Sequence, residues 1–313
     1  MKVIFMGTPE FAVASLDAIN KVHEVIWVVT VADKPAGRGK KIRYSAVKEY
    51  ALENDLPLLQ PEKLKDKEFV NSLQKLNADL FVVVAFRMLP EIIWSMPVKG
   101  TINLHGSLLP NYRGAAPLNW AIMNGDSKTG ATTFFIKKEI DTGNIIDTVE
   151  VEITENMDAG DLHDRLMLEG ADLLIDTINN IGQGKVTGTP QAELITDKIK
   201  EAPKIFKDTC RIDWNNSNSE VHNHIRGLSP YPAAWSTLID SDCKELGLKL
   251  FKTIKTESNL TPGIIKTDGK ELLQIGCGSG SLQILELQLA GKKRMDIKSF
   301  LNGIKLDDSY KCI

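Results

Sequence analysis

The chain has 313 residues, of which 42% are hydrophobic and 25% charged, and its formal net charge is −3 at pH 7. This balance predicts a soluble globular protein, long enough for two domains, and excludes a strongly basic nucleic-acid module. The apolar run at residues 80–86 is far too short to span a membrane and the N-terminus lacks a signal-peptide pattern, so we expect a cytoplasmic protein.

Strands and helices alternate through the first half of the chain. The apolar run at residues 2–7 predicts a buried strand, and similar runs predict strands at residues 24–32, 78–86, 100–107 and 129–138. Helical spacing of apolar residues predicts helices at residues 10–21, 45–55, 67–77, 117–125 and 158–182. This alternation is typical of an α/β fold with a doubly wound, mostly parallel sheet.

The last third of the chain has a different pattern. The periodicity weakens at residues 185–207, which we interpret as a linker between an N-terminal domain at 1–184 and a C-terminal domain at 208–313. The C-terminal domain opens with a helical stretch at 218–228, continues with short β segments between turn residues, and ends with a helix at 295–303. This spacing predicts a small closed or partly open β-barrel.

Dinucleotide and metal sites are both disfavoured. The first strand-to-helix turn carries only Gly7, whereas a dinucleotide fingerprint needs three glycines for close approach to the pyrophosphate. The cysteines, Cys210, Cys243, Cys277 and Cys312, form no CxxC pair and have no nearby histidine at metal spacing. We therefore expect reduced thiols and no metal.

The stretch INLHGSLLP at residues 102–110 carries the first candidate site. Asn103 and His105 lie two residues apart near the end of a predicted strand, so their side chains share one face at the sheet edge where ligands bind. An amide can donate to an oxyanion and an imidazole can move a proton near neutral pH, which suits acyl-type transfer. A buried core histidine is the simpler alternative. Ser107 lacks a G-x-S-x-G context, which disfavours a serine hydrolase.

A carboxylate that could orient His105 lies further along the chain. Asp141 follows the strand predicted at 129–138, in the sequence Asp-Thr-Gly. An Asx turn is the alternative reading, and an aspartic-protease dyad would need a second copy of this triplet.

The segment at residues 33–43 is a candidate phosphate-binding arm. It contains one acid and five basic residues, with two glycines that make it flexible, and a solvated surface loop is the alternative. The basic residues considered for an anionic partner are Arg38, Lys40, Lys41 and Arg43.

Together these stretches resemble the 10-formyltetrahydrofolate-dependent formyltransferase family, and within it the enzymes that act on methionyl-tRNA. The resemblance covers nearly the whole chain, through the segments MGTPEFA, DKPAGRGKK, NLHGSLLPNYRGAAP, DTGNII, RIDW and LQLAGKKRMD. It implies a Rossmann-like catalytic domain at 1–184 and an OB-like, tRNA-binding β-barrel domain at 208–313. The one departure is at residues 82–93, where the loop is one residue shorter than the family's Ala-Tyr-Gly-x-x-Leu-Pro pattern and Arg87 stands near the expected glycine.

The resemblance also implies the activity and its residues. The enzyme would transfer the formyl group of 10-formyltetrahydrofolate to the α-amino group of methionyl initiator tRNA, as a monomer and without a metal. Asn103 would stabilise the oxyanion, His105 would transfer the proton, and Asp141 would hold His105. The residues implied to contact the folate are Ser107, Leu108, Leu109, Pro110, Phe86, Arg87, Leu89, Thr142 and Gly143, and those implied to contact tRNA are Arg38, Lys40, Lys41 and Arg43.

Three other functions stay open at this point. The first is a formyltransferase for a small amine, such as an amino-sugar nucleotide. The second is a noncatalytic tRNA-binding module, which the complete set of Asn103, His105 and Asp141 argues against. The third is a folate hydrolase, in which water replaces the amine.

Overall fold

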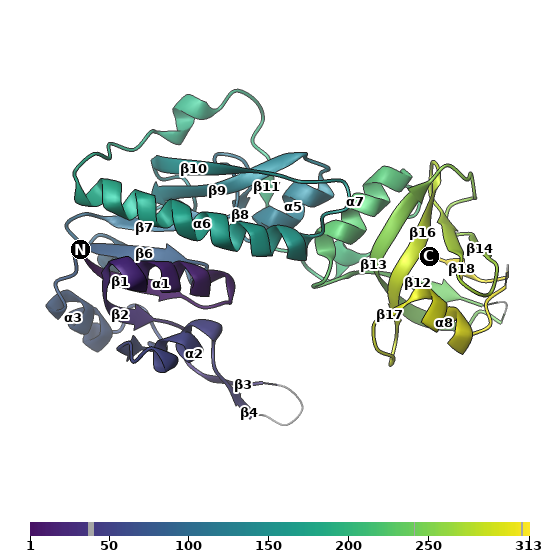
Figure 1. Ribbon diagram of the computed structural model, residues 1–313, viewed down its shortest axis with the longest axis horizontal. Coiled ribbons are helices and arrows are strands. Elements are labelled where there is room, and N and C mark those ends of the chain that lie inside the picture. Colours follow the sequence, from purple (N-terminus) through teal and green to yellow (C-terminus); the bar gives the residue numbers. More distant parts are fainter. Residues whose placement is uncertain (37–40, 241, 308) are drawn as a thin grey trace. The chain divides into compact units, whose positions relative to one another are not determined.

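The computed structural model describes residues 1–36, 41–240, 242–307 and 309–313, with the backbone alone at 35–36 and 41–42. The chain forms two compact units (Figure 1). The first unit comprises Met1–Gly114, Thr129–Val151 and His163–Glu201, and the second comprises Ala115–Lys128, Glu152–Leu162 and Ala202–Ile313. No helix within the described residues is long and apolar enough to cross a bilayer.

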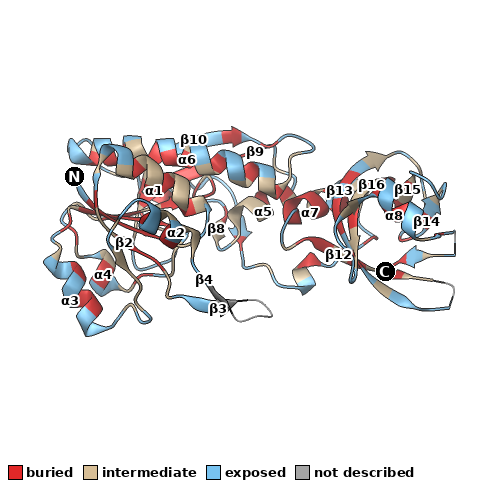
Figure 2. Ribbon diagram, turned by 60° about the horizontal axis from the view of Figure 1, so that its bottom comes forward, coloured by how far each residue is buried: buried red, intermediate tan, exposed pale blue. Residues whose placement is uncertain are grey.

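The first unit is built on a seven-stranded sheet with the order β10-β9-β7-β6-β1-β2-β5. The strands are β1 (Lys2–Gly7), β2 (Glu24–Val29), β5 (Leu58–Leu59), β6 (Leu80–Val84), β7 (Thr101–His105), β9 (Lys128–Phe135) and β10 (Ile145–Glu152). Neighbouring strands in the run β7-β6-β1-β2-β5 are parallel, and β9 is antiparallel to β7. The central strands β1 and β6 are buried almost throughout, as expected for apolar strands covered on both faces (Figure 2).

Helices cover this sheet. They are α1 (Phe11–Val22), α2 (Ala46–Glu53), α3 (Lys67–Lys75), α4 (Glu91–Trp94) and α6 (Ala159–Gly182). Local sequence explains where two of them begin: the Ser45 hydroxyl accepts from the Lys48 N–H, and the Asp66 carboxylate accepts from the N–H groups of Glu68 and Phe69. Side chains of α3 and α4 form one core cluster with alternate residues of β1 and β6, including Ile4 and Val83.

Shorter elements complete the first unit. They are β3 (Lys34–Ala36), β4 (Lys41–Arg43), β8 (Arg113–Gly114), the 3-10 helix η1 (Gln191–Leu194) and β11 (Glu201–Ala202), whose last residue belongs to the second unit. Strands β3 and β4 pair as an antiparallel hairpin. The first unit extends to Glu201, so it includes η1 and part of the segment at 185–207 that the sequence indicates as a linker. The domain boundaries predicted at residues 184 and 207 stay predictions.

The second unit is a nearly closed antiparallel barrel. Its strands are β12 (Ala234–Ile239), β13 (Glu245–Thr256), β14 (Ile265–Thr267), β15 (Leu273–Gly276), β16 (Ser281–Leu289), β17 (Met295–Asp296) and β18 (Lys311–Cys312). They pair in the order β14-β15-β16-β13-β12-β18, with β17 beside β16. A bridge between Ile264 and Lys311 joins the two ends of this order. The predicted fold class, a mostly parallel Rossmann-like sheet followed by an OB-like barrel, is confirmed.

Helices of the second unit are α5 (Pro117–Met123), α7 (Asn218–Leu228), α8 (Ile297–Gly303) and the 3-10 helix η2 (Asp208–Cys210). Helix α7 has the bounds that the sequence predicts, and Ser217 and Glu220 form a reciprocal capping box at its start. Its buried residues, among them Val221 and Ile225, join the barrel core.

Candidate active site

The carboxyl end of β7 places Asn103 and His105 on one face of the sheet. Asn103 pairs with Val83 of β6, and paired residues of parallel strands point to the same face, so Asn103 shares the face that packs on α3 and α4. Leu104 points to the other face, where its Cδ2 lies 2.9 Å from the position that a Cβ on Gly170 of α6 would take. Asn103 and His105 therefore face away from α6.

His105 is held by a backbone carbonyl. The side chain is 7% exposed, and its Nε2 lies 2.8 Å from the carbonyl oxygen of Tyr112. A carbonyl only accepts hydrogen bonds, so we assign the proton of the neutral ring to Nε2. Nδ1 then carries the lone pair and is free to take a proton. It lies 3.8 Å from Oδ2 of Asp141.

Asp141 reaches His105 from the loop between β9 and β10. Its Oδ2 accepts a hydrogen bond from the N–H of Gly114 at 3.0 Å, and its side chain is 16% exposed. A carboxylate in this position can stabilise the positive charge that forms when His105 takes a proton. The structure thus brings together the imidazole and the carboxylate that the sequence singled out.

The amide of Asn103 is available for a ligand. Its side chain is partly exposed, and among the described residues no side-chain hydrogen bond involves it. An amide with unused donors beside a buried histidine fits a carbonyl oxygen that becomes negatively charged.

The turn after β7 has internal hydrogen bonds. The Ser107 hydroxyl is fully buried and donates to the carbonyl of Asn111 at 2.7 Å. The Thr132 hydroxyl donates to the Ser107 carbonyl at 2.6 Å, and the Leu109 N–H donates to the Thr132 oxygen at 3.1 Å. Leu109 and Pro110 are also buried, whereas Leu108 is partly exposed. Of these four residues predicted to contact folate, Leu108 alone has a side chain that is partly open.

The loop after β6 contains the other predicted wall of the folate site. Arg87 donates to the carbonyls of Pro61 at 2.8 Å and Glu62 at 3.0 Å, and burial lowers its pKa. Its guanidinium carbon is 5.2 Å from the centre of the Phe86 ring. Phe86 is partly exposed, whereas Leu89 is buried in the core. Arg87 therefore anchors the loop after β6 to residues 61–62, which follow β5 in the sequence.

Thr142 and Gly143 follow Asp141 in the same loop. The Thr142 hydroxyl donates to the carbonyl of Glu139 at 3.1 Å. Gly143 is buried, and a Cβ added to it would lie 1.5 Å from the carbonyl oxygen of Phe135. This close approach admits only glycine and fixes the loop against the end of β9.

Gln191 is a site residue that the sequence did not predict. It lies in η1, is 3% exposed, and its Nε2 donates to the carbonyls of Asp141 at 2.9 Å and Gly143 at 2.8 Å. Its Oε1 accepts from Nε of Arg113 at 3.0 Å and from Nη2 at 2.6 Å. The guanidinium of Arg113 is thus held by Gln191. The weak periodicity around Gln191 gave no signal of this role.

The basic segment at 33–43 is described in part. Arg38 and Lys40 lie outside the described residues, as does the side chain of Lys41. Arg43 is exposed on β4 opposite Lys34. At the base of the hairpin, the Asp33 carboxylate accepts from Lys48 and from Gln60.

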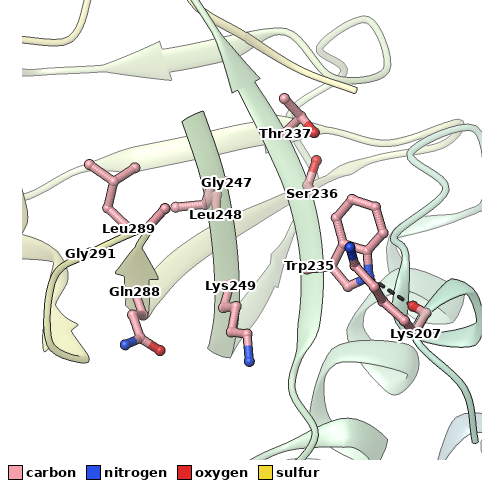
Figure 3. Close-up of a pocket in the computed structure, with 11 residues that line it drawn as sticks. Lys207, Trp235, Ser236, Thr237, Gly247, Leu248, Lys249, Gln288, Leu289 and Gly291 are labelled. Atoms are coloured by element: carbon pink, nitrogen blue, oxygen red, sulfur yellow. Dashed lines mark hydrogen bonds between the residues drawn. The ribbon is translucent and has the colours of Figure 1, made fainter. Parts of the chain in front are cut away.

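A groove of about 460 Å³ lies on the barrel of the second unit (Figure 3). Trp235, Lys249 and Gln288 form a row across β12, β13 and β16, in directly paired positions. The Trp235 N–H donates to the Lys207 carbonyl at 2.8 Å, and the Lys207 ammonium lies 5.5 Å from the ring centre. An aromatic side chain with cations beside it is typical of a surface that binds single-stranded nucleic acid.

Comparison with known proteins identifies the class first. Residues 1–178 match the formyl transferase family and residues 204–305 match the C-terminal domain of formyl transferases, so the chain belongs to this family. Among curated relatives, it is 53% identical over 314 residues to methionyl-tRNA formyltransferase of Flavobacterium johnsoniae, covering 99% of this chain and 98% of the relative. It is 50% identical over 315 residues to methionyl-tRNA formyltransferase of Bacteroides fragilis, covering 99% and 97%. The family resemblance found in the sequence is confirmed.

Solved structures share the fold at lower identity. An N-formyltransferase from Helicobacter canadensis, in complex with folinic acid and dTDP-3-aminofucose, superposes with a TM-score of 0.66 at 21% identity, covering 94% of this chain and 100% of that chain. HypX from Aquifex aeolicus, in complex with tetrahydrofolic acid, superposes with a TM-score of 0.62 at 19% identity, covering 98% of this chain and 48% of that chain.

Proposed function

We propose that this protein transfers the formyl group of 10-formyltetrahydrofolate to the α-amino group of methionyl initiator tRNA, giving N-formylmethionyl-tRNA for translation initiation. The observation that carries the proposal is the convergence of His105 and Asp141, 3.8 Å apart, at the end of the strand that presents Asn103. About half of the residues are identical to curated methionyl-tRNA formyltransferases over nearly the whole chain, which supports the same acceptor.

Three side chains perform the reaction. A new bond forms between the amino nitrogen of methionine and the formyl carbon, and the bond from that carbon to the folate nitrogen breaks. Asn103 donates a hydrogen bond to the formyl oxygen as negative charge develops there. His105 takes the proton of the attacking amine at Nδ1 and returns it to the leaving nitrogen. Asp141 stabilises the charged imidazole in between.

The folate site is formed by the loops around these residues. The donor supplies an activated one-carbon unit, and the unused Asn103 amide fits its carbonyl oxygen. We assign the partly exposed side chains of Phe86, Leu108 and Thr142 to the wall of the site. The buried residues Ser107 and Leu109 shape the turn, so any contact they make with folate is through the backbone.

The tRNA binds through local patches, because the whole chain carries a net charge of −3. We assign phosphate contacts to the hairpin segment with Arg38, Lys40, Lys41 and Arg43. The groove beside Trp235 and Lys249 gives the second unit a surface of the same chemistry. We propose that the enzyme acts as a monomer in the cytoplasm, where charged tRNA is used.

The test is an acceptor assay. The purified chain is incubated with 10-formyltetrahydrofolate and methionyl initiator tRNA, and formylmethionine on the tRNA is measured. A parallel incubation supplies an amino-sugar nucleotide in place of tRNA. We expect transfer to the tRNA alone. Transfer to the sugar alone, or formyl release to water without an acceptor, would overturn the proposal.

A further inference from the structure

Gln191 connects the loop that carries Asp141 to the side chain of Arg113. Its amide nitrogen donates to the carbonyls of Asp141 and Gly143, and its amide oxygen accepts from the guanidinium of Arg113. The next residue, Gly114, donates its N–H to the Asp141 carboxylate. The contacts thus form a closed ring, which fixes Asp141 at its backbone and at its side chain.

The backbone of Asp141 needs such support. Its φ is +53°, in the left-handed region that residues with a Cβ adopt at a cost. A residue in this conformation persists when its surroundings hold it there. Gln191 is 3% exposed, so its hydrogen bonds compete little with water.

The chemistry of the position requires glutamine. Two backbone carbonyls need donors, and a guanidinium needs an acceptor on the same short side chain. A glutamate would still pair with Arg113, but it would present an oxygen to the carbonyls of Asp141 and Gly143. An apolar residue would leave the guanidinium of Arg113 without this acceptor.

We infer that Gln191 is a positioning residue for formyl transfer, which holds the Asp141 carboxylate toward His105. This inference rests on the proposed function. Gln191 does not touch the reacting atoms, so its loss lowers kcat and leaves the KM for both substrates little changed.

Three variants test this role in the full chain: Gln191→Ala, Gln191→Glu and the control Thr177→Val. Thr177 is as buried as Gln191, and its hydroxyl pairs with that of Thr133 at 2.8 Å, next to Leu104 on the sheet face away from His105. Circular dichroism verifies folding, and single-turnover transfer to methionyl initiator tRNA gives the rate. Glu keeps the volume of the side chain, so this variant serves if Ala unfolds the loop.

We expect both Gln191 variants to lower kcat by about 10- to 100-fold, as small misplacements in active sites do, while Thr177→Val keeps the wild-type rate. In an Asp141→Ala background, Gln191→Ala should add less than about threefold, because the group it positions is gone. Equal losses in both backgrounds, or an unchanged kcat, would overturn the inference. An inactive wild-type chain would instead overturn the proposed function.

Discussion

An unused amide and a buried imidazole lie two residues apart at the end of β7. In the proposed reaction, Asn103 stabilises charge on the substrate and His105 moves a proton at Nδ1, while the Tyr112 carbonyl holds the other ring nitrogen, Nε2. The two roles require different surroundings: the amide stays partly exposed, whereas the imidazole is 7% exposed and lies beside a carboxylate. Because side chains alternate along a strand, residues 103 and 105 point to the same face, and the two roles can be filled side by side.

Replacing Asn103 tests the oxyanion role. Asn103→Ala should lower kcat by about 10²- to 10³-fold, the usual effect of losing one oxyanion donor, while folate binding is kept. Single-turnover formyl transfer and equilibrium folate binding measure the two effects. Asn54→Ala removes an exposed amide at the end of α2 and serves as the control. A normal rate in Asn103→Ala would remove this residue from the mechanism.

Part of the site could be predicted from residues alone. Asn103 and His105 share a face because strand side chains alternate, and this needs no tertiary information. Asp141 was indicated by its Asp-Thr-Gly context, but its distance to His105 depends on how the β9–β10 loop folds. Gln191 could not be predicted, because its partners lie 48 to 78 residues away in the sequence.

The loop between β9 and β10 is the element that sets the position of Asp141. At Gly143, an added Cβ would overlap the Phe135 carbonyl oxygen at 1.5 Å, and a backbone atom cannot move away cheaply. Gly143→Ala should therefore lower activity at least tenfold and cost about 1–3 kcal/mol of stability. Gly182→Ala on α6 is the control, since its Cβ would make only ordinary contact with Met1 at 3.5 Å. Similar activity in both variants would contradict the importance of this loop.

We expect His222 of helix α7 to make the second unit sensitive to acid. His222 is buried, with Nδ1 2.8 Å from the Thr253 hydroxyl and Nε2 3.2 Å from the Glu155 carbonyl. Burial lowers the pKa of His222. The positive charges of Arg226 and Lys255 lower this pKa further, whereas the Glu155 carbonyl and carboxylate raise it. Because the unfolded chain binds the proton more readily, stability is lost as the pH falls below about 6.5 toward the folded pKa.

This acid sensitivity predicts a difference in melting temperature. Between pH 7.5 and 5.5 the Tm of the wild-type chain should fall more than that of His222→Gln, whose amide can still donate to Glu155. His23 and His224 also have lowered pKa values through burial, so part of the fall remains in the variant. Calorimetry at the two pH values measures it. An equal fall in both proteins would show that His222 contributes nothing to the pH dependence.

Long elements were predictable and short ones were not. Helix α6 follows its apolar period, strand β6 is a continuous apolar run, and the Ser217 cap marks the start of α7. The two- and three-residue strands β3, β4, β5, β8 and β11 have no period to detect. They form because tertiary contacts pair backbones that carry no local signal.

At the scale of the whole molecule, the sequence predicts two domains in series. In the structure, the segments Ala115–Lys128 and Glu152–Leu162 pack in the second unit, although they precede residue 184 in the chain. The Asn119 amide donates to the Gly227 carbonyl at 2.7 Å, and Arg226 donates to the carbonyls of Thr154 at 3.2 Å and Met157 at 2.8 Å. These hydrogen bonds join residues that are 69 to 108 positions apart. Spacing along the chain does not reveal such contacts.

A substitution in the basic segment at residues 33–43 tests how the molecule recognises a large substrate. Arg38→Ala should raise the KM for tRNA severalfold, because it removes a phosphate contact, and should leave folate binding unchanged. Steady-state kinetics with varied tRNA and varied folate separate the two effects. Lys21→Ala, an exposed residue paired with Asp17, is the control. An equal loss with tRNA and with a small amine acceptor would contradict this role.

The most direct measurement compares methionyl initiator tRNA with methionyl elongator tRNA as acceptors for the formyl group of 10-formyltetrahydrofolate. The two substrates carry the same amino acid, so the difference in kcat/KM reports recognition of the tRNA and the chemistry together. We predict rapid formylation of the initiator and little or none of the elongator. Equal formylation of both, or of neither, would contradict the proposed function.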